Sequence, residues 1–183
     1  MNIVVAITGA SGAIYARQSL DILLAMPEVS RIALLMSCHA EDVITAEGVT
    51  LPTSERIERF SNDDMWSSLA SGSARWDAML VVPASMGSVA RIATGISQTL
   101  IERTADVMLK ERRPLVMVVR EAPYSLIHLR NMTALTEAGA IIVPASPSFY
   151  FRPTTIEELC LSVSQRAVEH LGIKVEQDRK SVV

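Results

Sequence analysis

The chain of 183 residues is 49% apolar, and its 17 basic and 20 acidic side chains give a net charge of −3. This length suits one domain that buries a core without disulfide or metal staples. The negative charge and the lack of a Lys/Arg block argue against nucleic-acid binding. The apolar runs are far shorter than the roughly 20 residues that a membrane helix needs.

The N-terminus and the cysteines bear on whether the protein is secreted, disulfide-bonded or metal-binding. The opening MNIVVAITGASG has no basic n-region and no cleavage site, so no signal peptide is predicted. Cys38 and Cys160 lie far apart, without a CxxC motif or a His-rich neighbour, so we expect neither a disulfide framework nor a metal site. These features predict a soluble, cytoplasmic protein.

Short apolar, β-branched runs alternate with longer helical patterns along the chain. A predicted strand at 3–7 precedes a helix at 13–26, and a strand at 32–36 precedes a helix at 38–46. Further strands at 79–82, 115–119 and 140–143 each precede a helical stretch, and that after 115–119 covers 125–135. This alternation predicts an α/β fold: a single Rossmann-like domain whose parallel sheet has helices on both faces.

The segment 50–74 is the least regular part of the chain, with Pro52, an acidic cluster at 62–64 and a run of small residues at 67–73. We interpret it as strand fragments and a mobile loop within one domain of residues 1–173. Residues 174–183 form a polar C-terminal tail that we expect to fray.

Two small-residue loops follow predicted strands: Gly9-Ala10-Ser11-Gly12, and the run 83–88, which contains Ser85-Met86-Gly87-Ser88. In an open parallel sheet, ligands bind beyond the carboxyl ends of the strands, where the strand order reverses. Each loop leads into a helix, whose free N–H groups attract phosphate. Either loop alone is equally well explained as a tight turn, but together they favour a phosphorylated ligand.

The missing motifs indicate which ligand fits. Neither GxGxxG nor the P-loop motif is present, and Ser37 stands where an acidic residue would bind an adenosine ribose. Ser11, Ser37, Ser85 and Ser88 all fall at predicted strand ends, and serines suit one phosphate and a polar ring system. FMN therefore fits better than NAD. GxSxG is absent too, so no serine nucleophile is indicated.

The basic residues give a second indication. Only three are lysines, and Lys110 is the one that lies outside the tail. Arg120 and Glu121 follow the predicted strand 115–119, on the side of the sheet where ligands bind. They could bind an anion and transfer a proton, or they could be a surface ion pair of little energetic weight. His128 is better explained by packing or capping than by catalysis, and most methionines as core filling.

At this point the sequence resembles a known family, the flavin prenyltransferases of the UbiX type, in the superfamily of homo-oligomeric flavin-containing cysteine decarboxylases. The match runs from residue 3 to 172. The stretches that carry it are TGASGAIYA (8–16), MS (36–37), ASGS (70–73), VPASMGS (82–88), LIERTADVMLKERRPLVMVVREAPYSLIHLRNM (100–132) and PSFYFRP (147–153).

The resemblance implies a reaction and a cofactor. The family joins the dimethylallyl group of dimethylallyl phosphate to N5 and C6 of reduced FMN. The product, prenylated FMN, serves UbiD-type decarboxylases. The implied FMN contacts are Gly9, Ala10, Ser11, Ser37, Ser85, Met86, Gly87, Ser88 and Arg120.

The resemblance also assigns the second substrate and the assembly. Tyr150 and Arg166 would grip the prenyl phosphate, with Lys110, Arg120 and Glu121 completing that site. Residues expected at the reaction centre are Glu121, Lys110, Ser11 and Glu47. The family builds such sites from neighbouring subunits, so a homo-oligomer, commonly a dodecamer, is implied, and no metal is needed.

This chain departs from the family pattern in places. Cys38 stands where the family usually has the Lys of an SK pair. Met65 stands where the family often has Trp, and Pro83-Ala84-Ser85 stands in place of a PCS form. Two other functions stay open on the sequence: an FMN-dependent decarboxylase of a small acid, and a non-catalytic FMN carrier subunit.

Overall fold

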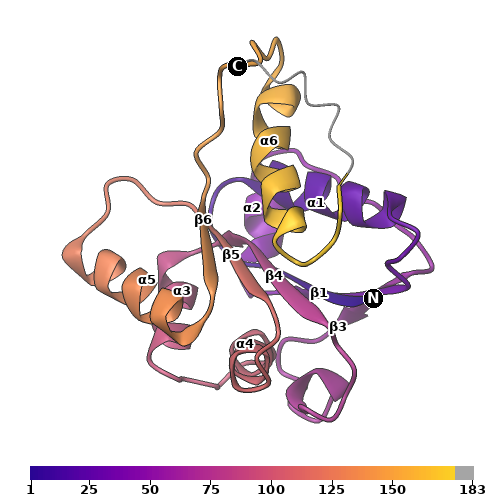
Figure 1. The fold of residues 1–183 in the computed structure, drawn as a ribbon, viewed down its shortest axis with the longest axis vertical. Coiled ribbons are helices and arrows are strands. Elements are labelled where there is room, and N and C mark those ends of the chain that lie inside the picture. The colour runs from indigo at the N-terminus through magenta and orange to yellow at the C-terminus, as the bar shows by residue number, and fades with distance from the viewer. Residues whose placement is uncertain (176–183) are drawn as a thin grey trace.

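The computed structural model describes residues 1–175 and contains one six-stranded sheet, all parallel, in the order β3-β2-β1-β4-β5-β6. The strands are β1 (Asn2–Ile7), β2 (Arg31–Met36), β3 (Ile57–Phe60), β4 (Ala78–Ala84), β5 (Leu115–Val119) and β6 (Ile141–Pro144). Helices cover both faces of the sheet (Figure 1). The α/β Rossmann-like prediction is confirmed.

Residues 1–175 contain six α-helices and one short 3₁₀ helix, all between strands except α6, which follows β6. They are α1 (Ala13–Ala25), α2 (Ala40–Ala46), η1 (Ser68–Ala70), α3 (Met86–Ala93), α4 (Leu100–Lys110), α5 (Leu126–Ala138) and α6 (Ile156–Glu169). Helices α1, α2 and α6 lie on one face, and α3, α4 and α5 on the other (Figure 1).

The sheet separates two hydrophobic cores because successive side chains of a strand point to opposite faces. Along β1, Ile3, Val5 and Ile7 pack in the core beneath α1 and α6, while Val4 and Ala6 pack in the core beneath α3 and α4. Strands covered on both sides need continuous apolar runs, which is why the central strands were recognisable in the sequence.

The predicted elements agree with the observed ones except near their ends and in one segment. The helix predicted from residue 38 begins at Ala40. The irregular segment 50–74 supplies the edge strand β3 and the 3₁₀ helix η1. Strand β3 was hard to recognise because its two central residues, Glu58 and Arg59, are exposed.

The C-terminal end is described only as far as Val175. The predicted tail lies outside the described residues from 176 onward, while Val175 packs against the core beneath α1 and α6. No helix within residues 1–175 is long and apolar enough to cross a membrane.

The strand order reverses at β1, which pairs with β2 on one side and β4 on the other. Thr8 joins the ends of β1 and β4. Its N–H and its hydroxyl both donate to the Pro83 carbonyl, at 3.2 and 2.8 Å, and its Oγ1 accepts the Ser85 N–H at 2.8 Å. Thr8 is fully buried, so this connection fixes how the loops after β1 and β4 lie beside one another.

Replacing Thr8 with Val tests this connection, because Val keeps the shape and removes the hydroxyl. The Ser85 N–H then loses its acceptor, so the free energy of unfolding in urea should fall by about 1–3 kcal/mol.

Thr104→Val is the matched control. The Thr104 hydroxyl is equally buried and donates to the Leu100 carbonyl of its own helix, at 2.7 Å, but it accepts no N–H from any residue between 1 and 175. If the free energy of unfolding falls no more in Thr8→Val than in Thr104→Val, the hydrogen bond from the Ser85 N–H does not contribute the predicted stability.

Candidate functional site

The structure brings the predicted loops together at the carboxyl edge of the sheet. The loop 9–12 follows β1, Ser37 follows β2, the run 85–88 follows β4, and Arg120 follows β5. The Ser37 N–H donates to the Ile7 carbonyl at 2.9 Å, and the Arg120 N–H reaches the Ala84 carbonyl at 3.4 Å. Four adjacent strands therefore contribute to one edge, at the point where the strand order reverses.

Two glycines shape the first loop. A Cβ on Gly9 would lie 2.9 Å from the Cβ of His39, so the loop passes directly against the start of α2. Gly12 has φ +114°, which side chains rarely adopt, and a Cβ there would meet the Tyr15 ring at 2.8 Å. Both positions need glycine for the chain to turn this closely into α1.

Glu47 occupies the start of α1. Its carboxylate accepts the Gly12 N–H at 2.9 Å and the Ala13 N–H at 2.7 Å. Desolvation raises the pKa of Glu47, but hydrogen bonds from the Ser11 hydroxyl and these two N–H groups, together with the charge of Arg120, outweigh it and lower the pKa. Glu47 is therefore ionised at neutral pH and fills part of this helix end.

The start of α3 is capped differently. The Ser85 Oγ accepts the Ser88 N–H at 3.3 Å, and the two serine hydroxyls lie 3.1 Å apart. Met86 and Gly87 begin the helix, where N–H groups have no acceptor within the helix. A hydroxyl cap leaves the positive end of this helix available to an anion.

Arg120 and Glu121 do not pair with each other. The Arg120 Nε is buried and has no hydrogen-bond partner among the described residues, while a Glu121 carboxylate oxygen accepts the N–H of the next residue, Ala122, at 3.0 Å. The interpretation of these residues as a surface ion pair is therefore wrong. The unpartnered Nε is a donor that a bound anionic or carbonyl-bearing ligand would satisfy.

A cavity of about 550 Å³ opens between the ends of β2 and β3 and the starts of α3 and α4. Ser37, Cys38 and Ser88 line it, together with the charged residues Arg91 and Glu102. Of the predicted FMN contacts only Ser37 and Ser88 line this cavity, and the loop 9–12 and Arg120 lie outside its lining. Its place at the carboxyl ends of the strands and its polar lining fit a ligand with a phosphate and a polar ring system, such as FMN.

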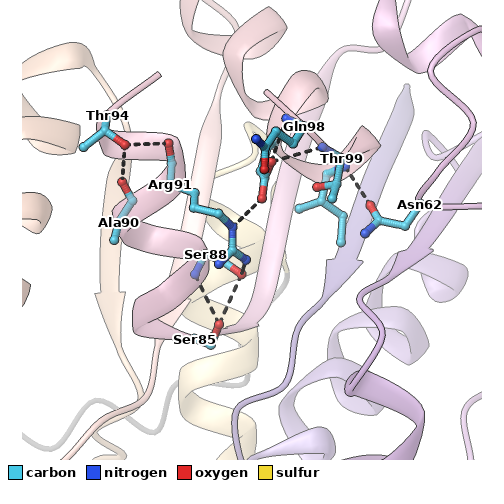
Figure 2. Close-up of polar contacts among 10 residues, drawn as sticks. Asn62, Ser85, Ser88, Ala90, Arg91, Thr94, Gln98 and Thr99 are labelled. Atoms are coloured by element: carbon cyan, nitrogen blue, oxygen red, sulfur yellow. Dashed lines mark hydrogen bonds and ion pairs between the residues drawn. The ribbon is translucent and has the colours of Figure 1, made fainter. Parts of the chain in front are cut away.

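A polar network supports one wall of this cavity (Figure 2). Arg91 pairs through its Nε with Glu102, which is only 2% exposed, and its Nη2 lies 3.4 Å from the Ser88 Oγ. Glu102 also accepts the N–H groups of Gln98 and Thr99, at 2.9 and 3.0 Å. Asn62 ties the start of α4 to the loop after β3 by accepting the Ile101 N–H at 3.0 Å.

Lys110 lies away from this edge. It is the last residue of α4, five residues before β5 begins at Leu115, so it lies at the amino edge of the sheet. Its ammonium pairs with the carboxylate of Glu111, and both side chains pack on Gly72. Arg113 donates to the Gly72 and Ala74 carbonyls, at 2.9 and 3.0 Å, so basic residues surround the loop 70–74.

Tyr150 and Arg166 also lie apart from the cavity. Tyr150 belongs to the segment after β6 and is 80% exposed. Arg166 lies in the last turn of α6 and pairs with Glu169 at 3.0 Å. Within one chain, none of Lys110, Tyr150 and Arg166 lines the cavity, so the structure does not assemble the whole predicted site in a single subunit.

His128 has a structural role, and the two tryptophans differ in burial. His128 accepts the Ser125 N–H at 3.2 Å through Nδ1 and so caps α5, as the sequence indicated. Trp76 is buried in the core beneath α3 and α4, whereas Trp66 is 99% exposed.

Sequence reasoning missed Arg91 and Glu102. The pattern Thr99-x-x-Glu102 at the start of α4 is a capping-box signature that could have located Glu102. Nothing in the sequence separates Arg91 from an ordinary exposed helix residue, because its partner is 11 residues away on another helix.

Known proteins are similar to this chain in sequence and in fold. The flavoprotein family model matches residues 1–167. The flavin prenyltransferase UbiX of Methanocaldococcus jannaschii is 42% identical over 176 residues, which cover 94% of each chain.

Two solved structures share the fold and much of the sequence. AnUbiX (PadA1) in complex with FMN and dimethylallyl pyrophosphate is 43% identical, with a TM-score of 0.86, over 94% of this chain and 92% of that one. A dodecameric FMN-dependent UbiX-like decarboxylase from Escherichia coli O157:H7 is 38% identical, with a TM-score of 0.87, over 95% of this chain and 96% of that one.

Fold, site position and sequence similarity over nearly the full length thus lead to one conclusion. The chain belongs to the flavoprotein family and, within it, to the UbiX-type flavin prenyltransferases.

Proposed function

We propose that this protein joins the dimethylallyl group of dimethylallyl phosphate to N5 and C6 of reduced FMN and so makes prenylated FMN. The observation that carries the proposal is the likeness to AnUbiX, whose structure holds both FMN and a dimethylallyl donor and is 43% identical to this chain. The carboxyl edge described above supplies a site of suitable chemistry for FMN.

In this proposal the carboxyl edge holds FMN. The contributing residues are Gly9, Ala10, Ser11, Ser37, Ser85, Met86, Gly87, Ser88 and Arg120. Arg120 supports this assignment because its buried Nε lacks a partner. Bound reduced FMN supplies the electron-rich N5 and C6 positions that take the prenyl group. To the surroundings of these positions we assign the exposed Ser11 hydroxyl and the Glu47 carboxylate that it contacts.

Departure of the phosphate requires cations near its developing negative charge. We assign this role to Lys110, Arg120 and Arg166, with Tyr150 donating a further hydrogen bond. Ring closure at C6 would release a proton, and we assign its acceptance to Glu121, which follows Arg120 at the carboxyl end of β5. The prenyl group carries positive character as the phosphate leaves, so the closed site must exclude water.

The separation of these residues favours a site shared between subunits. Lys110 and Glu121 lie at opposite ends of β5, whose five residues span about 16 Å. Large apolar side chains are exposed on α5 and after β6, among them Leu126, Ile127, Phe149 and Ile156. We therefore propose a homo-oligomer of the dodecameric kind seen in the Escherichia coli relative.

Prenylated FMN is a cofactor, so another enzyme must use it. We propose that the protein works in the cytoplasm and that prenylated FMN passes to a UbiD-type decarboxylase. Storage of FMN alone would not require Lys110 and Arg166, the basic residues assigned to the prenyl phosphate. It would also not explain the likeness to a structure that binds a prenyl donor, so a carrier role is disfavoured.

A second candidate function is direct FMN-dependent decarboxylation, because the Escherichia coli relative is described as a decarboxylase. One anaerobic experiment separates the two. The protein is incubated with reduced FMN and either dimethylallyl phosphate or dimethylallyl pyrophosphate, and the flavin is analysed by mass spectrometry. A dimethylallyl mass increment on FMN supports prenyl transfer. Unmodified flavin with both donors, in a preparation that binds FMN, would overturn it.

Glu121→Gln tests the proton-transfer role. Gln keeps the shape and an acceptor oxygen but is a poor base, so donor affinity should stay nearly unchanged while the chemical step slows ~10²–10⁴-fold. Product joined at N5 alone should accumulate, because the proton is lost at ring closure. Single-turnover absorbance measures both rates. Fully cyclised product at the wild-type rate would contradict the role.

Arg166→Ala tests the prenyl-phosphate contact. Loss of a charge-assisted hydrogen bond to phosphate should weaken donor binding by about one to two orders of magnitude, whereas FMN affinity should stay unchanged. Separate titrations with each substrate measure this. A variant that loses FMN but keeps its donor affinity would show that Arg166 belongs to the cofactor site.

Glu47→Gln tests the capping carboxylate. The lowered pKa means that ionised Glu47 stabilises the fold above its ordinary carboxyl pKa of 4.5 and that this contribution is lost as the pH falls through the lowered value. Since Glu47 is exposed, the loss at neutral pH should be small, roughly 0.5–1 kcal/mol, and should shrink in acid. Urea unfolding across this pH range measures it. The exposed Glu55→Gln serves as control, and a loss that does not change with pH would exclude the ionised contact.

A further inference from the structure

We propose that Arg91, held in place by Glu102, binds the phosphate group of FMN in this protein. This inference rests on the proposed binding of FMN and assigns one residue that the resemblance does not. It follows from the direction of the Arg91 side chain, the burial of its partner and the residues that share the cavity with it.

Arg91 reaches from α3 across the cavity wall to α4 (Figure 2). Its Nε pairs with Glu102, and its Nη2 lies 3.4 Å from the Ser88 Oγ. A Cβ on Gly87 would lie 3.3 Å from Nη1, so the guanidinium rests against the first turn of α3. The glycine leaves this approach free.

Glu102 fixes the guanidinium from one side only. The carboxylate is 2% exposed and also accepts the Gln98 and Thr99 N–H groups, so it cannot turn away. The Arg91 side chain itself is 45% exposed and lines the cavity. The Nε is thus paired with Glu102 and the Nη2 lies against Ser88, while the exposed part of the guanidinium lines the cavity in which we propose that the phosphate binds.

This arrangement places a cation beside the positive end of a helix. The N–H groups that begin α3 and the guanidinium that lies over Gly87 carry charge of the same sign, which is unfavourable without an anion between them. A phosphate monoester carries up to two negative charges and would accept hydrogen bonds from both, and from the Ser88 hydroxyl.

The other residues that line the cavity support this location. Its basic lining residues are Arg59 and Arg91, and Cys38 beside them brings no positive charge. Glu41 and Asp63 also line the cavity, and their carboxylates would repel a phosphate placed near them. The region around Arg91 and Ser88 is therefore the favoured one for a phosphate.

The test compares FMN with riboflavin, which lacks the phosphate. Arg91→Ala alone would leave Glu102 buried without its partner and could unfold the protein, so the main variant is Arg91→Met combined with Glu102→Gln. Gln keeps an acceptor for the two N–H groups. Dissociation constants come from quenching of flavin fluorescence, and circular dichroism checks the fold.

We expect wild type to bind FMN more tightly than riboflavin, and the double variant to bind FMN ~10- to 100-fold more weakly with riboflavin affinity unchanged. Arg91→Lys should restore part of the preference for FMN. Arg59→Ala is the matched control, since it removes an equal charge that lines the same cavity from the edge strand β3, and it should keep that preference.

Equal losses for both flavins in the double variant would overturn the proposal, as would a selective loss in Arg59→Ala alone. Wild type that prefers FMN to riboflavin, together with a double variant that keeps this preference, would overturn the role of Arg91 and leave the proposed function intact. Wild type that binds neither flavin would overturn both.

Discussion

The site depends on the buried hydroxyl of Thr8, which connects two strands that run side by side but lie far apart in the sequence. It donates to the Pro83 carbonyl and accepts the Ser85 N–H, and so couples the end of β1 to the start of α3. From Ser85 the connection continues through Ser88 and Arg91 to Glu102 in α4. A hydrogen bond at the strand reversal thus sets the position of side chains on two helices.

Much of the fold could be predicted from the sequence because buried parallel strands are continuous apolar runs. The run at 115–119 was recognised with the bounds that β5 has in the structure. Strand β3 was not resolved within its irregular segment, since an exposed edge strand with Glu58 and Arg59 at its centre lacks that signal. Strands were therefore predictable where burial restricts them to apolar residues. They were not predictable where the strand is exposed to solvent and accepts any residue type.

The site was predictable only where it lies in loops directly after strands. Ser37, Ser85 and Arg120 gain their positions from the sheet, so a correct strand assignment also places them. The pairing of Arg91 with Glu102 depends on how α3 packs beside α4, and the placement of Lys110 at the other edge depends on the direction of α4. Such relations belong to tertiary packing and leave little trace in local sequence patterns.

The separation of Lys110 and Glu121 along β5 has a genetic consequence. In the shared-site assembly proposed above, the Lys110 and the Glu121 that serve one reaction centre belong to different copies of the chain. A subunit defective at Lys110 and another defective at Glu121 would each be inactive alone, yet a mixed assembly would contain some centres with both residues intact. Two inactive alleles would then complement each other in one cell, because each reaction centre forms between two subunits and needs only one intact residue from each.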